Sequence, residues 1–170
     1  MRILKPPVNI VCVKYGTKYN KEDVLNLLEM VEKNCSLPFS FYCLSDEEIE
    51  GVSTIPLDLS LDLESYWWKI CLFNLDWDVP TLYLDLDICI QNNLDHMFED
   101  ISKGALTVIR GDDMGLYYPY DGGYTIMTIP QAVLNTSIMG FYPRYHKGLY
   151  DKFMEDPETN MVMYYGLDRF

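Results

Sequence analysis

The sequence predicts an α/β domain in which helices flank a central, mostly parallel β-sheet. Short apolar segments of strand character alternate along the chain with segments of helical periodicity, and this alternation is typical of parallel sheets. The composition is 49% hydrophobic, which is enough for a substantial core. A length of 170 residues corresponds to one domain, so we expect residues 1–170 to fold as a single unit.

The first part of the chain shows this alternation clearly. Strands are expected at 9–13, at 39–44 and within 51–57. After the first strand, Asn20 and Asp23 have the spacing of a capping box. Apolar residues then recur with the period of an amphipathic helix, which we expect over residues 21–33.

The stretch Thr81–Ile90 is expected to be the central strand, because aliphatic residues occupy every second position. Its other face carries Asp85 and Asp87. Side chains two positions apart on a strand are separated by about 6.5–7 Å, so both carboxylates could bind one divalent cation. Without a cation they would repel each other, although a solvated edge strand is the alternative. No cluster of His and Cys accompanies them, so the expected ion is Mn²⁺ or Mg²⁺.

The segment before this strand is expected to be a buried helix over residues 66–74, capped by Ser65. Adjacent helical residues point about 100° apart, so of Trp67 and Trp68 one should face the core and the other should border a pocket. Lys69 would then lie beside an aromatic wall, where it could bind a phosphate or a ribose. A lysine whose stem covers a core helix explains the same pattern equally well.

Further elements follow the central strand. A short segment is expected at 94–99, strands at 104–109, 126–129 and 136–142, a loop at 111–123 and a last helix at 146–155. The loop is inferred from its glycines and its proline, which interrupt regular structure.

The composition also limits which binding partners and which cell compartment are expected. The net charge is −13, from 26 acidic and 13 basic residues, so neither nucleic acid nor an anionic membrane surface is an expected partner. The sequence has no signal peptide and no apolar run of about 18 residues, so no membrane span is expected. Five scattered cysteines without a CxxC pair favour free thiols in a reducing compartment, the cytoplasm.

Three segments are expected to meet at one edge of the sheet. Lys14–Tyr19, Asp85–Asp87 and Arg110–Asp113 each follow or end a strand, and ligands of parallel α/β sheets bind beyond the carboxyl ends of the strands. Tyr15 and Tyr19 could stack on a nucleobase there, or they could be ordinary surface tyrosines.

Several segments, taken in order, carry a resemblance to a known family. They are the strand that ends in Lys14-Tyr15-Gly16, the Trp67-Trp68-Lys69 helix, Asp85-Leu86-Asp87 as a DxD motif, Asn92–Phe98, Asn135–Met139 and Tyr165–Phe170. Together they resemble the GT-A-type glycosyltransferases, in particular the glycogenin-like, family-8-like group and its compact microbial or viral relatives. The similarity covers most of residues 8–170.

The resemblance implies a Rossmann-like GT-A fold and a hexosyltransferase-type activity. The donor would be a nucleotide sugar, most often a UDP-sugar such as UDP-glucose, and the acceptor a glycan, a protein or a small molecule. By this resemblance Asp85 and Asp87 would hold Mn²⁺ (or Mg²⁺) on the diphosphate, where a metal neutralises charge on the leaving group. The residues expected to contact the nucleotide or the sugar are Lys14, Tyr15, Tyr19, Trp67, Lys69, Arg110, Asn135 and Ser137.

The stereochemistry decides which catalytic residues are needed. Retention of the anomeric configuration fits the resemblance, whereas inversion would need a general base. Asp168 and Asp112 are the candidate catalytic residues, with Asp113 and Asp121 as alternatives.

The chain departs from the family pattern near its end. Many relatives supply a third metal ligand, a His, in a C-terminal segment without a counterpart in these 170 residues. Either the chain is truncated there, or water and phosphate complete the metal shell. The Asp-Gln pair of the family is Asp168-Arg169 here.

Two other functions are compatible with parts of the pattern. One is a haloacid-dehalogenase-like phosphatase that uses Asp85 and Asp87 on its nucleophile strand. The other is a non-catalytic module that binds sugar nucleotides or carbohydrate. Mn²⁺-dependent release of UDP from a UDP-sugar would distinguish a transferase from both.

Overall fold

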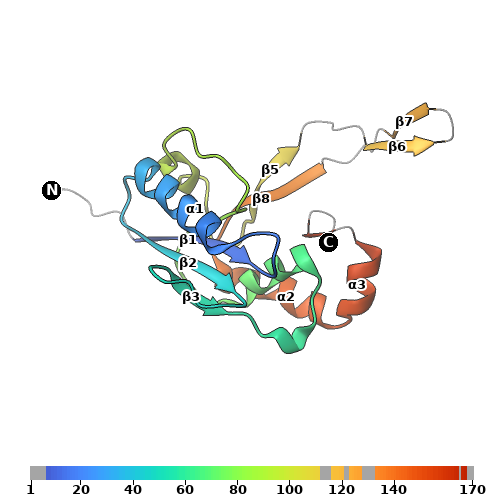
Figure 1. Ribbon diagram of the computed structural model, residues 1–170, viewed down its shortest axis with the longest axis horizontal. Coiled ribbons are helices and arrows are strands. Elements are labelled where there is room, and N and C mark those ends of the chain that lie inside the picture. The colour runs from blue at the N-terminus through green and yellow to red at the C-terminus, as the bar shows by residue number, and fades with distance from the viewer. Residues whose placement is uncertain (1–6, 112–115, 121–122, 128–132, 165, 168–170) are drawn as a thin grey trace.

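The protein folds around a six-stranded sheet with the strand order β3-β2-β1-β4-β8-β5. The computed structural model describes residues 7–111, 116–120, 123–127, 133–164 and 166–167 (Figure 1). The strands of this sheet are β1 (Val8–Lys14), β2 (Phe39–Ser45), β3 (Ser53–Pro56), β4 (Thr81–Leu84), β5 (Thr107–Gly111) and β8 (Val133–Phe141). β1 to β4 pair in parallel, and β8 runs antiparallel to both β4 and β5. The predicted α/β domain with a mostly parallel sheet is confirmed.

Helices cover both faces of the sheet (Figure 1). They are α1 (Lys21–Asn34), α2 (Lys147–Met154), α3 (Pro157–Met163) and the 3₁₀ helices η1 (Leu59–Leu61), η2 (Ser65–Asn74), η3 (Asp95–Phe98) and η4 (Pro143–His146). Leu82 and Leu84 belong to the core under α1 and η3, whereas Tyr83 belongs to the core under η2 and α2. Since successive strand residues point to opposite faces, β4 contributes to both halves of the core.

The helix α1 has the predicted start. The side chain of Asn20 accepts a hydrogen bond from the Asp23 amide (3.0 Å), and the Asp23 carboxylate accepts one from the Asn20 amide (2.8 Å). These two bonds form the capping box and satisfy amides that have no partner inside the helix. Val24, Leu27 and Val31 are fully buried against the sheet, as the predicted periodicity requires.

The central strand is shorter than predicted. β4 ends at Leu84, and its four residues are all buried, so the strand has no solvated face. Its pairing with β8 ends at Leu84 and Ile138, and the Asp85 amide then bonds the carbonyl of Ser137 (2.9 Å) as the chain turns. Asp85 and Asp87 therefore lie in the turn beyond the strand, and the predicted strand spacing does not apply to them.

The buried helix before β4 also differs from the prediction. η2 is a 3₁₀ helix that begins at Ser65, and its N-cap is Glu64, which makes no side-chain cap bond. Ser65 has φ +33° and is not the cap. Trp67 and Trp68 are both buried in one core cluster, because η2 is covered on more than one side. The prediction that one of the two tryptophans borders a pocket is therefore wrong, because both side chains belong to the core.

The second half of the chain brings further corrections. β5 begins at Thr107, later than the strand expected at 104–109, and its pairing with β8 shifts register between Val108 and Ile109. Part of the loop expected at 111–123 is an antiparallel pair of β6 (Leu116–Tyr120) and β7 (Gly123–Met127). Aromatic and β-branched residues favour strands, and here they outweigh the glycines. The rest of that loop lies outside the described residues.

The last predicted strand and helix are confirmed as β8 and α2, but α3 was not predicted. It begins after Asp156, whose side chain accepts a hydrogen bond from the Thr159 amide (3.1 Å). Pro157 occupies the first turn, where its missing N–H leaves no bond unmade. The strand expected at 126–129 overlaps the end of β7 at residues 126–127, and residues 128–129 lie outside the described residues.

Candidate functional site

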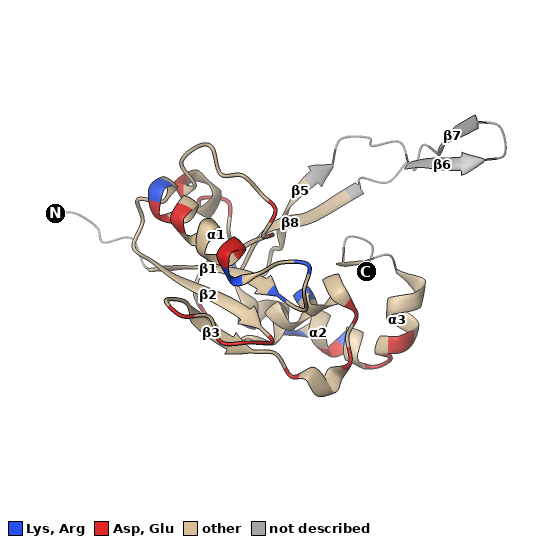
Figure 2. Cartoon of the chain, in the orientation of Figure 1, with Lys and Arg blue, Asp and Glu red and all other residues tan. Residues whose placement is uncertain are grey.

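The carboxyl ends of β1 and β4 meet the start of η2 at a pocket of ≈ 130 Å³. We call it the aspartate pocket; its lining residues are Val13, Tyr15, Lys18, Tyr19, Ser65, Tyr66, Lys69, Asp85, Leu86 and Asp87. Figure 2 shows Lys residues on and beside the loop that follows β1, in a chain that is otherwise rich in acidic residues. The pocket thus combines carboxylates, cations and aromatic rings at the sheet edge where α/β proteins bind ligands.

Asp85 is held from two sides. The hydroxyl of Tyr83 donates a hydrogen bond to Asp85 Oδ1. The Lys69 ammonium lies 2.8 Å from Oδ1 and 3.0 Å from Oδ2. Burial, followed by the charge of Asp85 and the hydrogen bond to it, raises the pKa of Tyr83 well above its usual value. The phenol therefore stays protonated and remains a donor to the carboxylate.

Asp87 is more open to solvent. Its side chain is 59% exposed and lies 4.0 Å from the Lys18 ammonium. Tyr19 donates a hydrogen bond to Asp87 Oδ2 (2.7 Å). Burial raises the pKa of Tyr19, Asp87 raises it further, and Lys18 acts in the opposite direction. These contacts tie the loop after β1 to the turn after β4.

The aromatic residues of the site divide between the pocket and the core. Tyr15 lines the pocket, is 38% exposed, and packs on Trp68 with ring centroids 4.9 Å apart. Trp67 is fully buried and packs on Phe153 at 4.8 Å. The structure therefore does not bring Trp67 to the pocket, and Tyr66 lines it instead.

Lys14 has partners of its own inside the protein. Its side chain is 3% exposed, and its ammonium lies 2.8 Å from Glu47 and 3.3 Å from Asp46. It also bonds the carbonyl of Gly16 (3.2 Å). Burial lowers the pKa of Lys14, but the hydrogen bonds to Glu47 and Asp46 raise it to above its usual value. Lys14 thus anchors the base of the loop and does not line the aspartate pocket.

The remaining predicted residues lie on or near β5 and β8. The side chain of Asn135 accepts a hydrogen bond from the Ser137 amide (2.8 Å), and the Ser137 carbonyl accepts the bond from Asp85. Arg110 pairs with Leu134 through the backbone of β5 and β8. The side chain of Arg110 and the whole of Asp112 and Asp168 lie outside the described residues.

The sequence did not identify Lys18, Ser65 and Tyr66 as ligand-binding residues, although they line the pocket together with the apolar Val13 and Leu86. Lys18 could have been found, because it lies in the polar loop between the two predicted tyrosines. Ser65 and Tyr66 precede the Trp-Trp-Lys motif, and only the turn of the chain into η2 brings them to the pocket.

Asp85 and Asp87 line the same pocket and could serve as two ligands of a hard divalent cation. Among the described residues, no group of three or more His, Cys, Asp or Glu side chains gathers as a metal site. Mg²⁺ is commonly held by one or two carboxylates together with waters and substrate phosphates. Two carboxylates correspond to the protein's share of such a site, and in this structure the Lys69 ammonium contacts both oxygens of Asp85.

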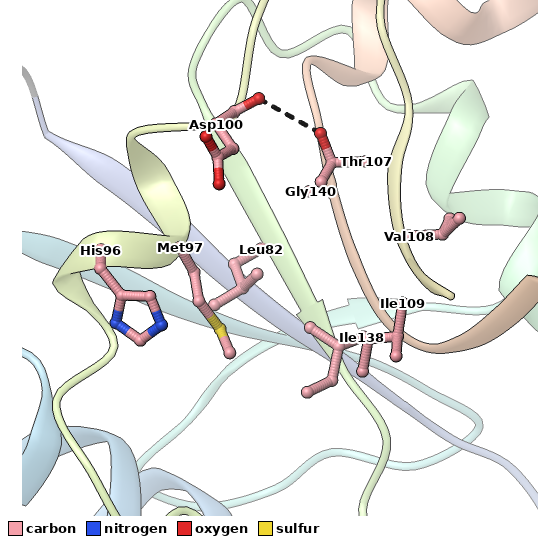
Figure 3. Close-up of a pocket in the computed structure, with 9 residues that line it drawn as sticks. All are labelled: Leu82, His96, Met97, Asp100, Thr107, Val108, Ile109, Ile138 and Gly140. Carbon is pink, nitrogen blue, oxygen red and sulfur yellow. Dashed lines mark hydrogen bonds between the residues drawn. The ribbon is translucent and has the colours of Figure 1, made fainter. Parts of the chain in front are cut away.

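Figure 3 shows a second pocket, which has a volume of ≈ 180 Å³. Its walls are mostly apolar, with Leu82, Met97 and Ile138 among them. The Thr107 hydroxyl donates a hydrogen bond to the Asp100 carbonyl (3.2 Å), and both residues line the pocket (Figure 3). It shares no lining residue with the aspartate pocket.

The fold of the chain is similar to that of several solved glycosyltransferase structures. No family model and no curated protein sequence matches it. The galactosyltransferase LgtC, solved in complex with donor and acceptor sugar analogs, is similar with a TM-score of 0.63 and 13% identity over 92% of this chain. The glycosyltransferase GlyE of Streptococcus pneumoniae TIGR4 gives 0.59 and 13% over 95%. The bifunctional glycosyltransferase WbbM gives 0.57 and 10% over 91%.

These likenesses define the fold as that of the GT-A-type glycosyltransferases, as predicted. The chain spans 66%, 42% and 35% of the three solved chains. A haloacid-dehalogenase-like phosphatase is not favoured by them. Within the described ranges, no helix has both the length and the apolar character needed to cross a membrane.

Proposed function

We propose that the protein is a metal-dependent glycosyltransferase that moves a sugar from a nucleotide-sugar donor, a UDP-sugar, to a hydroxyl group of an acceptor. The observation that carries the proposal is the convergence of Asp85, Asp87 and Lys69 with Tyr15 and Tyr19 on one pocket. This pocket lies at the carboxyl ends of β1 and β4, in a fold shared with solved glycosyltransferases.

The two carboxylates would hold Mn²⁺ or Mg²⁺ against the donor diphosphate. When bound, the ion supplies positive charge that stabilises the departing nucleoside diphosphate. Lys69 is already beside Asp85 and would add a second cation next to the phosphates. Tyr83 holds the Asp85 carboxylate in a fixed orientation, so the ligand is positioned before the donor arrives.

The nucleoside would lie against the loop that follows β1. Tyr15 offers a partly exposed ring supported from behind by Trp68, and aromatic rings stack readily on planar bases. Lys18, 71% exposed, adds positive charge beside Asp87. A net charge of −13 would otherwise repel an anionic donor, so local cations and a bound metal would both be needed.

The test measures release of UDP from UDP-glucose and from other UDP-sugars, with and without Mn²⁺. We expect Asp85→Asn and Asp87→Asn each to lower the release rate by about 100-fold or more, because charge on the leaving group is no longer neutralised. Asp100→Asn is the matched control, since Asp100 is exposed and does not line this pocket.

The same measurement separates the other functions. Full release rates in both aspartate variants would refute the proposed metal site. Binding of UDP without any release from any UDP-sugar would favour a non-catalytic binding module. Titration of UDP by calorimetry, with and without Mn²⁺, shows whether a lost activity reflects lost donor binding.

A further inference from the structure

A larger cavity adjoins the aspartate pocket. It measures ≈ 780 Å³ and shares Tyr15 and Ser65 with that pocket. Its walls are the segment from Ser60 to Ser65 on one side and residues of α3 on the other. We call it the α3 cavity; its lining residues are Tyr15, Ser60, Leu61, Asp62, Leu63, Glu64, Ser65, Pro157, Glu158, Met161 and Val162.

A hydrogen bond joins the two walls of the α3 cavity. The Glu64 amide donates a hydrogen bond to the Met161 sulfur (3.5 Å). Met161 also packs on the core cluster that contains Leu63 and Trp67. The cavity is therefore part of the folded structure and not a gap between independent segments.

The lining combines apolar surface with groups that bind hydroxyls. Leu61, Leu63 and Met161 supply apolar area, and Ser60 and Ser65 supply hydroxyl groups. The charged lining side chains are all carboxylates, namely Asp62, Glu64 and Glu158. Carboxylates accept hydrogen bonds from hydroxyl or ammonium groups, and like charge disfavours an anion.

We infer that the α3 cavity binds the acceptor, and that this acceptor is an uncharged or cationic polyhydroxyl compound such as a neutral or amino sugar. The inference rests on the proposed function, because only a donor in the aspartate pocket gives the neighbouring cavity this role. In the transfer, an acceptor hydroxyl oxygen bonds the anomeric carbon of the donor. The bond from that carbon to the diphosphate breaks, the diphosphate leaves with the electron pair, and the hydroxyl proton passes to solvent.

Three probes that differ mainly in charge test the inference: glucose, glucosamine and glucuronate. Their binding to the full chain is followed by shifts of backbone amide resonances. We expect glucose and glucosamine to shift the amides of residues 60–65 and 157–162. Glucuronate should bind about tenfold or more weakly at low salt, because the charged side chains that line the cavity are all carboxylates. Replacing Asp62 and Glu158 by their amides should remove most of that difference.

Two neighbouring residues of α3 give a matched pair of variants. Val162 lines the cavity and is 83% exposed, whereas Met163 is 65% exposed and does not line it. Val162→Trp should occupy part of the cavity and weaken sugar binding by about tenfold or more, and Met163→Trp should preserve it. Both side chains are on the surface, so neither change should unfold the protein.

The outcomes for the donor and the acceptor can be distinguished. UDP and Mn²⁺ are titrated into the same variants, and Val162→Trp should bind them as the unchanged protein does. No shift with any sugar, sugar affinity unchanged by Val162→Trp, or equal binding of glucuronate would overturn the inference even if UDP binds. Failure of UDP and Mn²⁺ binding instead refutes the proposed function, and with it the assignment of the cavity to an acceptor.

Discussion

Replacing Lys69 by Met tests whether a metal binds at Asp85. The Lys69 ammonium lies 2.8 Å and 3.0 Å from the two Asp85 oxygens, and the two side chains are only 15% and 20% exposed. A divalent cation must compete with this ammonium for the same oxygens. Methionine keeps most of the side-chain length but removes the charge, so Asp85 becomes a better metal ligand.

The expected magnitude follows from Coulomb's law. Two unit charges about 4 Å apart attract by about 4 kcal/mol at an effective dielectric constant of about 20. Part of this attraction is already offset by the desolvation of both groups. A net effect of about 1–2 kcal/mol corresponds to Mn²⁺ binding that is about 5- to 30-fold tighter in Lys69→Met.

The assay is titration of MnCl₂ by calorimetry in the absence of nucleotide, together with thermal unfolding at each Mn²⁺ concentration. Without metal, Lys69→Met should unfold at a lower temperature, because Asp85 has lost its cation. Mn²⁺ should restore more stability to this variant than to the unchanged protein, since it binds the folded state more tightly. Lys33→Met is the control, because Lys33 pairs with Glu29 on the exposed side of α1. Equal or weaker Mn²⁺ affinity in Lys69→Met would refute a metal site at Asp85.

Two further predictions concern stability. Gly140→Ala should lower the free energy of unfolding by about 1–3 kcal/mol in urea titrations, because a Cβ at Gly140 would lie 2.7 Å from Ile101 Cγ1. Gly148→Ala is the control, because a Cβ there meets nothing within 4 Å. An equal loss of unfolding free energy in both variants would contradict the packing argument. Hydrogen bonds from Ser36 lower the pKa of Asp95, so Asp95 stabilises the fold above about pH 4 and this contribution disappears as the pH falls through its lowered pKa. The stability difference between Asp95→Asn and the unchanged protein should shrink in acid, and a pH-independent difference would exclude this linkage.

Local patterns in the sequence predicted the parts of the fold that depend on near neighbours. The capping box at Asn20 and the period of Val24, Leu27 and Val31 are contained within α1, so the sequence was sufficient to place the helix. Parallel pairing of β1 and β2 followed from the alternation of strands and helices. These elements required no knowledge of distant contacts.

The central strand shows where such reasoning fails. The alternation through Thr81–Ile90 predicted a long strand, but a strand continues only while a partner pairs with it. β8 stops pairing with β4 at Ile138 and pairs only with β5 beyond it, so β4 stops at Leu84. Asp85 and Asp87 still meet at one pocket, for a different reason, because the turn after β4 faces the loop after β1.

Lys14 illustrates the same limit at a single residue. The resemblance to glycosyltransferases implied that Lys14 contacts the nucleotide. Its partners Asp46 and Glu47 are far away in sequence, and only the parallel pairing of β1 with β2 brings them to it. Asp46 and Glu47 follow the strand expected at 39–44, but the sequence alone does not show how close they lie to Lys14.

The anchoring of Lys14 has a consequence for how the first loop would respond to a ligand. The hydrogen bond from the Gly16 amide to Asp46 (2.9 Å) fixes the chain just after the buried Lys14. A ligand at Tyr15 would meet a backbone that is already ordered, so little chain entropy remains to be lost on binding. Substitutions of Lys14 should therefore appear as unfolding, whereas substitutions of Tyr15 should change affinity and leave the fold intact.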